Sequence, residues 1–225
     1  MAGEAGLRLV VNRLRGLEVC LWASMLAAAV SMGFTARSER ILDLAFAGVA
    51  PSAGQLQQID RTHLATAGLC LITFLVAVAT FVRWLQAVWD SDRLDREGLS
   101  TDPRWPVRIW FVPIVGVWQG YLVMHALVIA AGRGADRRLS PHSAPRLAGF
   151  VVLGWWLCSV IMATVVVLEV LNVQPASQIS DFAQVWPVQR SLDLANLRCV
   201  LTIVTGVLFW IVVRYIGRTL TLPRR

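Results

Sequence analysis

Apolar residues in this chain are gathered into long runs, and short polar stretches between the runs hold most of the charge. Four runs contain at least 18 residues with few charged ones: Leu17–Phe34, Leu64–Leu85, Leu147–Leu171 and Leu197–Ile216. A helix needs about 20 mainly apolar residues to cross the roughly 30 Å hydrocarbon core of a bilayer. The pattern therefore predicts an all-α integral membrane protein with four transmembrane helices.

A fifth apolar stretch, Val107–Ala131, is interrupted by Pro113, Gly116 and Gly120. Proline lacks the backbone donor that a helix interior requires, and glycine loosens the helical backbone. This stretch is therefore expected to form two short helices with a break between them, as a re-entrant or interfacial segment. An interrupted segment can also cross the bilayer, so five transmembrane helices are the alternative.

All 21 basic residues are arginines, and their positions favour the four-helix arrangement. Five crossings that start with the N-terminus inside would leave ten arginines inside and eleven outside. If Val107–Ala131 enters and leaves on the same side, the count becomes 16 inside and five outside. Positive charge is retained on the cytoplasmic side. We therefore expect both termini in the cytoplasm of a bacterium and the protein in its inner membrane.

Two further expectations follow from this topology. The residues Ile41–Phe46, in a predicted outer loop of residues 35–63, are expected to form a short surface helix on the outer leaflet. Several tryptophans are expected at the cytoplasmic interface, where an amphipathic ring is favoured; they are Trp84, Trp89, Trp105, Trp110 and Trp210.

Composition agrees with a single polytopic membrane domain over residues 1–225. Hydrophobic residues make up 56 % of the chain and charged residues 16 %, and the mean hydropathy is +0.61. The net charge of +7 lies mostly beside apolar runs, which fits anionic lipid headgroups rather than nucleic acid. The four cysteines lie inside apolar runs, where core packing is the expected role. A basic start and the Ala27–Ala29 run also permit a cleaved signal peptide, although the length of the first run favours a retained anchor.

Aromatic and proline residues around the interrupted stretch resemble a known pattern. The sequences are Phe81-Val-Arg-Trp84, Pro103-Arg-Trp105, Trp110-Phe-Val-Pro-Ile114 and Gly154-Trp-Trp156. Over about residues 80–215 the chain resembles an uncharacterised bacterial membrane family, domain of unknown function 4328. The chain departs from the family pattern at Ser91, Gly116 and Gly120, where asparagine or proline is usual. The resemblance implies a fold and a membrane location, and it implies no activity.

Polar groups in apolar runs are candidate functional residues because each is costly in a bilayer. Gln119 and His125 follow the interruption and could line a polar cavity. Glu18 and Arg214 lie near the inner ends of their runs and Glu169 and Arg198 near the outer ends, so two ion pairs are expected. A basic patch for anionic lipid or a partner is expected from Arg93, Arg96, Arg104, Arg133, Arg137, Arg138 and Arg146.

The sequence contains no catalytic, metal or cofactor motif. We therefore expect no cofactor and a non-enzymatic role, as an accessory or scaffold subunit that binds a membrane-protein partner or a second copy through the interrupted segment and the basic face. The first alternative is a transporter or channel component that uses the Pro113–Gly120 region. The second is a membrane enzyme that acts on lipid.

Overall fold

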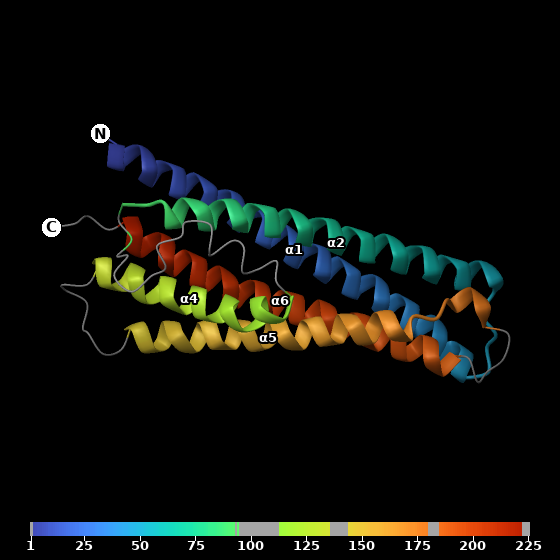
Figure 1. The fold of residues 1–225 in the computed structure, drawn as a ribbon. Helices are drawn as coiled ribbons and strands as arrows, with labels where there is room; N and C mark the ends of the chain where they lie inside the picture. The colour runs from blue at the N-terminus through green and yellow to red at the C-terminus, as the bar shows by residue number, and fades with distance from the viewer. Residues whose placement is uncertain (1, 93, 95–112, 136–143, 180–184, 222–225) are drawn as a thin grey trace. The chain divides into compact units, whose positions relative to one another are not determined.

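The computed structural model describes residues 2–92, 94, 113–135, 144–179 and 185–221. All regular elements within these ranges are helices: α1 (Ala2–Phe46), α2 (Ala53–Trp89), α4 (Pro113–Ala135), α5 (Ala144–Asn172), the 3-10 turn η2 (Ala176–Gln178) and α6 (Val185–Thr221). Figure 1 shows them in chain order. Four helices are long and apolar enough to cross a membrane, and α4 carries a shorter apolar stretch, Gln119–Gly132. The all-α class with four spanning helices and one shorter apolar helix is thus confirmed.

The long helices extend well beyond the apolar runs that predicted them. α1 has 45 residues and α2 and α6 have 37 each, which correspond to lengths of about 67 and 55 Å. The segment Ile41–Phe46, expected as a separate surface helix, is the end of α1. No glycine or proline lies between Phe34 and Phe46 to end the helix, and Leu42 is fully buried, so the expectation was wrong.

The turn from α1 to α2 is encoded locally. Gly48 takes the left-handed conformation (φ 87°), its N–H donates to Ala45 and the N–H of Val49 donates to Leu44, which is a Schellman ending. Ser52 then caps α2: the Gln55 N–H donates to Ser52 Oγ at 3.2 Å, and the Ser52 N–H donates to Gln55 Oε1 at 2.8 Å. This reciprocal pair is a capping box. Because α1 ends at Phe46 and α2 begins at Ala53, only a short hairpin connection remains of the predicted outer loop of residues 35–63.

α4 is continuous from Pro113 to Ala135, with no break at Gly116 or Gly120. Pro113 stands at the first position of the helix, where its missing N–H costs nothing. The predicted interruption within Pro113–Gly120 was therefore wrong, and the residues before Pro113 lie outside the described ranges. The re-entrant or interfacial course of this segment stays a prediction.

The chain divides into two compact units, and each long helix contributes to both. The first unit comprises residues 1–21, 76–157 and 205–225. Its core is apolar and aromatic, with Trp84, Leu85, Met124 and Leu127 fully buried. The rings of Trp84 and Trp89 are buried in this core, because they fill the space between helices, and their depth near the cytoplasmic interface stays a prediction. Trp105 and Trp110 lie outside the described residues.

The second unit comprises residues 22–75 and 158–204. It has its own smaller core, which joins α1, α2, η2 and α6 and consists of Leu42, Leu56, Ile59, Ala176, Val185, Val188 and Leu192. All seven residues lie beyond the apolar runs that predicted the spanning helices. The helix extensions therefore pack against one another, whereas the sequence predicted loops and one short surface helix here.

Candidate functional site

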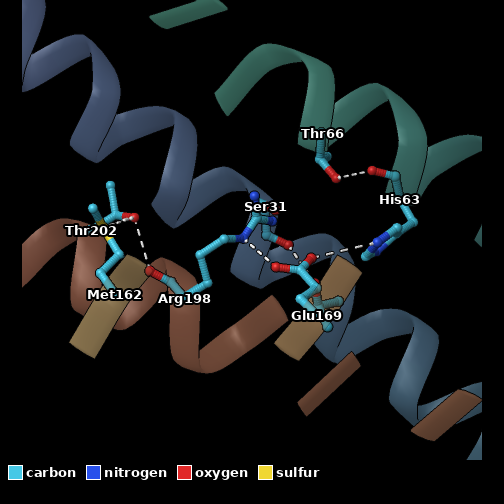
Figure 2. A network of polar contacts seen from close by, with 8 residues as sticks. Ser31, His63, Thr66, Met162, Glu169, Arg198 and Thr202 are labelled. Atoms are coloured by element: carbon cyan, nitrogen blue, oxygen red, sulfur yellow. Dashed lines mark hydrogen bonds and ion pairs between the residues drawn. The ribbon is translucent and has the colours of Figure 1, made fainter. Parts of the chain in front are cut away.

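A buried polar network in the second unit joins three helices. The Glu169 side chain, from α5, is only 8 % exposed. Its Oε2 lies 2.9 Å from Nε of Arg198 on α6, and its Oε1 lies 3.7 Å from Nε2 of His63 on α2. Figure 2 shows the Glu169 carboxylate between these two side chains. The structure thus brings the sequence-predicted partners Glu169 and Arg198 together and adds His63 to them.

The depth of these residues follows from the apolar runs. His63 immediately precedes the run that begins at Leu64, Arg198 follows the first residue of the last run, and Glu169 comes two residues before Leu171. Each residue therefore lies at the same end of its run when the helices alternate in direction. The depth of each residue can be predicted from the sequence. The rotation of each helix about its axis, which points the three side chains at one another, cannot.

Hydroxyl groups around the network are satisfied within their own helices. The Thr66 hydroxyl donates to the carbonyl of Thr62 at 2.9 Å, and the Thr202 hydroxyl donates to the carbonyl of Arg198 at 2.9 Å. The Arg198 Nε–H is close to the carboxylate but not aligned with it for a hydrogen bond. The attraction between Arg198 and Glu169 is therefore chiefly that of an ion pair, which is strong in a buried setting.

Two thiols lie beside the network. The side chains of Cys70 on α2 and Cys199 on α6 interact with each other, and the Ser31 hydroxyl interacts with Cys199. Cys199 is buried, Cys70 is half-buried, and all four cysteines are free thiols. In the described part of the chain, no group of three histidine, cysteine, aspartate or glutamate side chains is placed to hold a metal ion.

A second polar contact fixes the α5–α6 connection onto α2. The N–H groups of Ala176 and Ser177 donate to Oδ1 and Oδ2 of Asp60, at 2.6 and 2.9 Å. One carboxylate thus binds two successive backbone donors of η2. The Asn196 amide also donates to the Glu39 carboxylate, which links α6 to α1. Sequence reasoning missed these contacts, since their partners are more than 100 residues apart.

The other predicted ion pair does not form. Within the described residues, neither Glu18 nor Arg214 belongs to an ion pair. The Arg214 guanidinium carbon instead lies 4.8 Å from the centroid of the Trp210 ring, as a cation–π contact. Arg214 precedes the end of α6 by two turns, where Trp210 is its neighbour at four residues' spacing.

Gln119 and His125 do not converge on a cavity. They are six residues apart on α4, or about 240° around the helix, so they point to different sides. Both are half-buried. His125 packs on Tyr121, with ring centroids 5.6 Å apart. It also lies close to Gly149 on α5, where an added Cβ would be 3.5 Å from His125 Nε2. Neither residue lines the small cavity between α1 and α2.

The predicted basic patch lies mostly beyond the described ranges. Arg133 belongs to the end of α4 and Arg146 to the start of α5. The remaining members lie outside the described residues: Arg93, Arg96, Arg104, Arg137 and Arg138. The patch stays a prediction.

A family comparison agrees with the resemblance carried by the aromatic residues. The family described as domain of unknown function (DUF4328) matches residues 47–218, which is most of the chain. The chain belongs to this family. The match includes all three residues of the network and extends further toward the N-terminus than the expected residues 80–215. The curated proteins and the solved structures that were compared with the chain gave no match.

In this DUF4328 protein three described aromatic residues of the resemblance, Phe81, Trp84 and Trp155, are core residues. Phe81 lies 5.1 Å from Phe209 in an edge-to-face contact, and Trp155 stacks on the same ring at 5.0 Å. Trp84 is fully buried beside them. The described part of the pattern that identifies the family therefore specifies packing, and the polar network must be considered separately.

Proposed function

We propose that this DUF4328 protein is a non-enzymatic membrane subunit that supports the assembly of other membrane components, as an accessory or scaffold protein. One observation carries the proposal, which is the unequal burial of the four spanning helices. In the most apolar 18-residue stretch of α1 and of α6, 33 % of the residues are buried within the chain. The corresponding share is 17 % in α5 and only 11 % in α2. α2 and α5 thus present broad apolar faces for lipid or a partner helix.

The network supports the same role. One oxygen of the Glu169 carboxylate faces the Arg198 guanidinium and the other faces the His63 imidazole, and Asp60 and Glu39 bind groups on other elements. These polar groups hold helices together. Groups engaged in this way are suited to fixing the shape of a bundle whose outer helices dock onto a partner.

Photo-crosslinking from a single helix tests this proposal. A photoreactive amino acid replaces Ile161 on α5, which is 51 % exposed, and the matched control replaces Val165 one turn away, which is 5 % exposed. Crosslinking in native membranes is followed by mass spectrometry. We expect a protein partner in stoichiometric amount from position 161 and much less from position 165.

Two outcomes would contradict the proposal. If position 161 and the exposed position Ile72 on α2 give only lipid adducts, these faces are covered by lipid and bind no partner. If the purified protein alone catalyses a reaction that Glu169→Gln abolishes in a folded protein, the role is enzymatic.

We also infer a bacterial cytoplasmic membrane location with both termini in the cytoplasm. The arginine distribution supports this inference, with 16 residues on the cytoplasmic side against five on the other. The anionic leaflet would then attract the predicted basic patch, by about 1 kcal/mol for each arginine near the surface.

A further inference from the structure

A small cavity lies between α1 and α2 near their hairpin connection. Its volume is about 40 Å³, and its lining consists of Phe34, Arg37, Ser38, Ile41, Gln55, Gln58, Ile59 and Thr62. Phe34, Arg37, Gln55 and Gln58 are exposed, so the cavity is part of a surface groove. All of these residues belong to the second unit.

The ends of the apolar runs indicate that the groove lies at the level of phospholipid headgroups. The apolar run of α1 ends at Phe34, and the run of α2 begins two residues after Thr62. From Phe34 the lining continues to Ile41 on α1, which is a rise of about 10 Å. A headgroup layer is about 5–7 Å thick, so the groove covers the distance from the acyl chains across the headgroups.

The charge in the lining of the groove is positive. Arg37 is the charged residue of the lining, and Arg40 and Arg61 are exposed close by on the same helices. Among the described residues, none of these three arginines has an ion-pair partner. The neighbouring acids point elsewhere: Asp60 binds the N–H groups of η2, Glu39 binds Asn196, and Asp43 lies on the Glu39 side of α1. The groove therefore favours an anion.

The uncharged lining groups add acceptors and donors at fixed places. The hydroxyls of Ser38 and Thr62 donate to the carbonyls of Phe34 and Gln58, at 3.1 and 2.7 Å. Their oxygens therefore remain available as acceptors for a ligand hydroxyl. The Gln55 Oε1 is used by the N–H of Ser52, which leaves the Gln55 amide N–H groups as donors. A cation for phosphate thus stands beside acceptors for hydroxyl groups.

We propose that the α1–α2 groove binds the headgroup of a bilayer phospholipid that carries a phosphate and free hydroxyls, of the phosphatidylglycerol type. The Arg37 guanidinium binds the phosphate, for which its planar fork is well suited. The Ser38 and Thr62 oxygens accept from the glycerol hydroxyls, and an acyl chain lies on Phe34. A cavity of 40 Å³ is large enough for one terminal hydroxyl group, while the remainder of the headgroup lies in the open groove.

Native mass spectrometry of the full-length protein, titrated in detergent with phosphatidylglycerol, tests the site. Arg37→Gln should weaken binding of the tightest lipid by about tenfold or more, since a charge-assisted contact is lost. Arg37→Lys should retain part of the affinity, because it keeps the charge without the fork. Arg40→Gln is the matched control, an exposed arginine of α1 outside the lining, and should weaken binding much less than Arg37→Gln, because it removes charge near the groove but no contact with the phosphate. Circular dichroism and size-exclusion profiles establish that each variant is folded.

A second arm tests the hydroxyl contacts with phosphatidylmethanol, which has the same charge as phosphatidylglycerol but no headgroup hydroxyls. The unaltered protein should prefer phosphatidylglycerol, and Thr62→Val should remove that preference while phosphate binding persists. Equal binding of both lipids by the unaltered protein would overturn the assignment of the hydroxyl contacts.

Three other results would overturn the proposal. Equal losses in the Arg37→Gln and Arg40→Gln variants would mean general attraction of anionic lipid to the surface. Displacement of the lipid by soluble glycerol 3-phosphate at comparable concentration would assign the groove to a free phosphate compound. Loss of a dimer in Arg37→Gln with lipid binding unchanged would assign the groove to a second copy of the chain.

Discussion

At the scale of single residues, the structure is governed by the cost of charge in an apolar setting. Glu169 and Arg198 lie at the ends of apolar runs, and each would be unfavourable there alone. The structure places their charged atoms 2.9 Å apart and adds His63 on the other carboxylate oxygen. Glu18 and Arg214 have similar positions on their runs but remain apart. The position of a charged residue along its apolar run therefore indicates which residues could pair with it. The rotation of each helix about its axis decides which of these residues are in contact.

Breaking the Glu169–Arg198 pair should be more harmful than removing both charges. Glu169→Leu leaves the half-buried Arg198, with its buried Nε, without its carboxylate and should lower the free energy of unfolding by about 3 kcal/mol. The double variant Glu169→Leu/Arg198→Leu should recover most of this loss, because no uncompensated charge remains. Unfolding in mixed micelles, followed by tryptophan fluorescence, measures both.

Glu18→Gln is the control for this cycle, and its effect should stay within about 0.5 kcal/mol. If the double variant is as unstable as Glu169→Leu, the two charges do not stabilise the bundle as a pair.

At the scale of elements, local signals determine where helices begin and end, and distant contacts determine what the ends bind. Gly48 ends α1 and the Ser52–Gln55 capping box begins α2, and both signals are visible in the sequence. The position of η2 depends on Asp60, which lies more than 100 residues earlier. The first kind of signal can be predicted, whereas the second requires the fold.

Asp60→Ala should release η2 from α2. The N–H groups of Ala176 and Ser177 lose their carboxylate acceptor, so their amide hydrogens should exchange faster by about tenfold or more. Hydrogen exchange with mass spectrometry of peptides covering residues 173–179 measures this. Asp43→Ala, which removes an exposed acid of α1, should leave the exchange unchanged. Unchanged exchange in Asp60→Ala would show that this contact does not hold η2.

Helix packing in the first unit predicts different effects at two glycines. A Cβ at Gly217 on α6 would overlap the Cδ2 of Leu14 on α1, the end of a side chain that can move, whereas a Cβ at Gly16 would meet no atom within 4 Å. Gly16→Ala should stabilise the protein by up to about 1 kcal/mol, through helix propensity. Gly217→Ala should lose most or all of that gain, because the Leu14 side chain must be displaced. Thermal unfolding in detergent compares the two, and equal stabilisation would contradict the packing at Gly217.

At the scale of the whole molecule, four spanning helices and the arginine distribution support the proposed topology. An even number of crossings would place both termini on one side, and the proposed cytoplasmic orientation would put 16 arginines inside and five outside. A reporter fused after Ser140 should then be active as a cytoplasmic enzyme, and one fused after Val49 should be active outside. An extracytoplasmic signal at Ser140 would mean that residues 107–131 cross the bilayer.

The sequence alone predicted the helical class, the four spanning helices, a fifth apolar segment (but not its continuous helix) and the family. These features depend on hydrophobicity summed over about 20 residues and on motif spacing, which are local properties of the chain. Only the tertiary structure showed that Ile41–Phe46 continues α1, that Trp84 is a core residue, and that α1 and α2 form a groove around Arg37.

The network around Glu169 shows the same difference between what the sequence predicts and what helix packing decides. The sequence placed Glu169 and Arg198 at the outer ends of their runs, because a bilayer tolerates charge there. It could not bring in His63, since the side that a helix presents to its neighbours is decided by many packing contacts together. Hydrophobicity determines how deep a residue lies, and packing between helices determines what it touches.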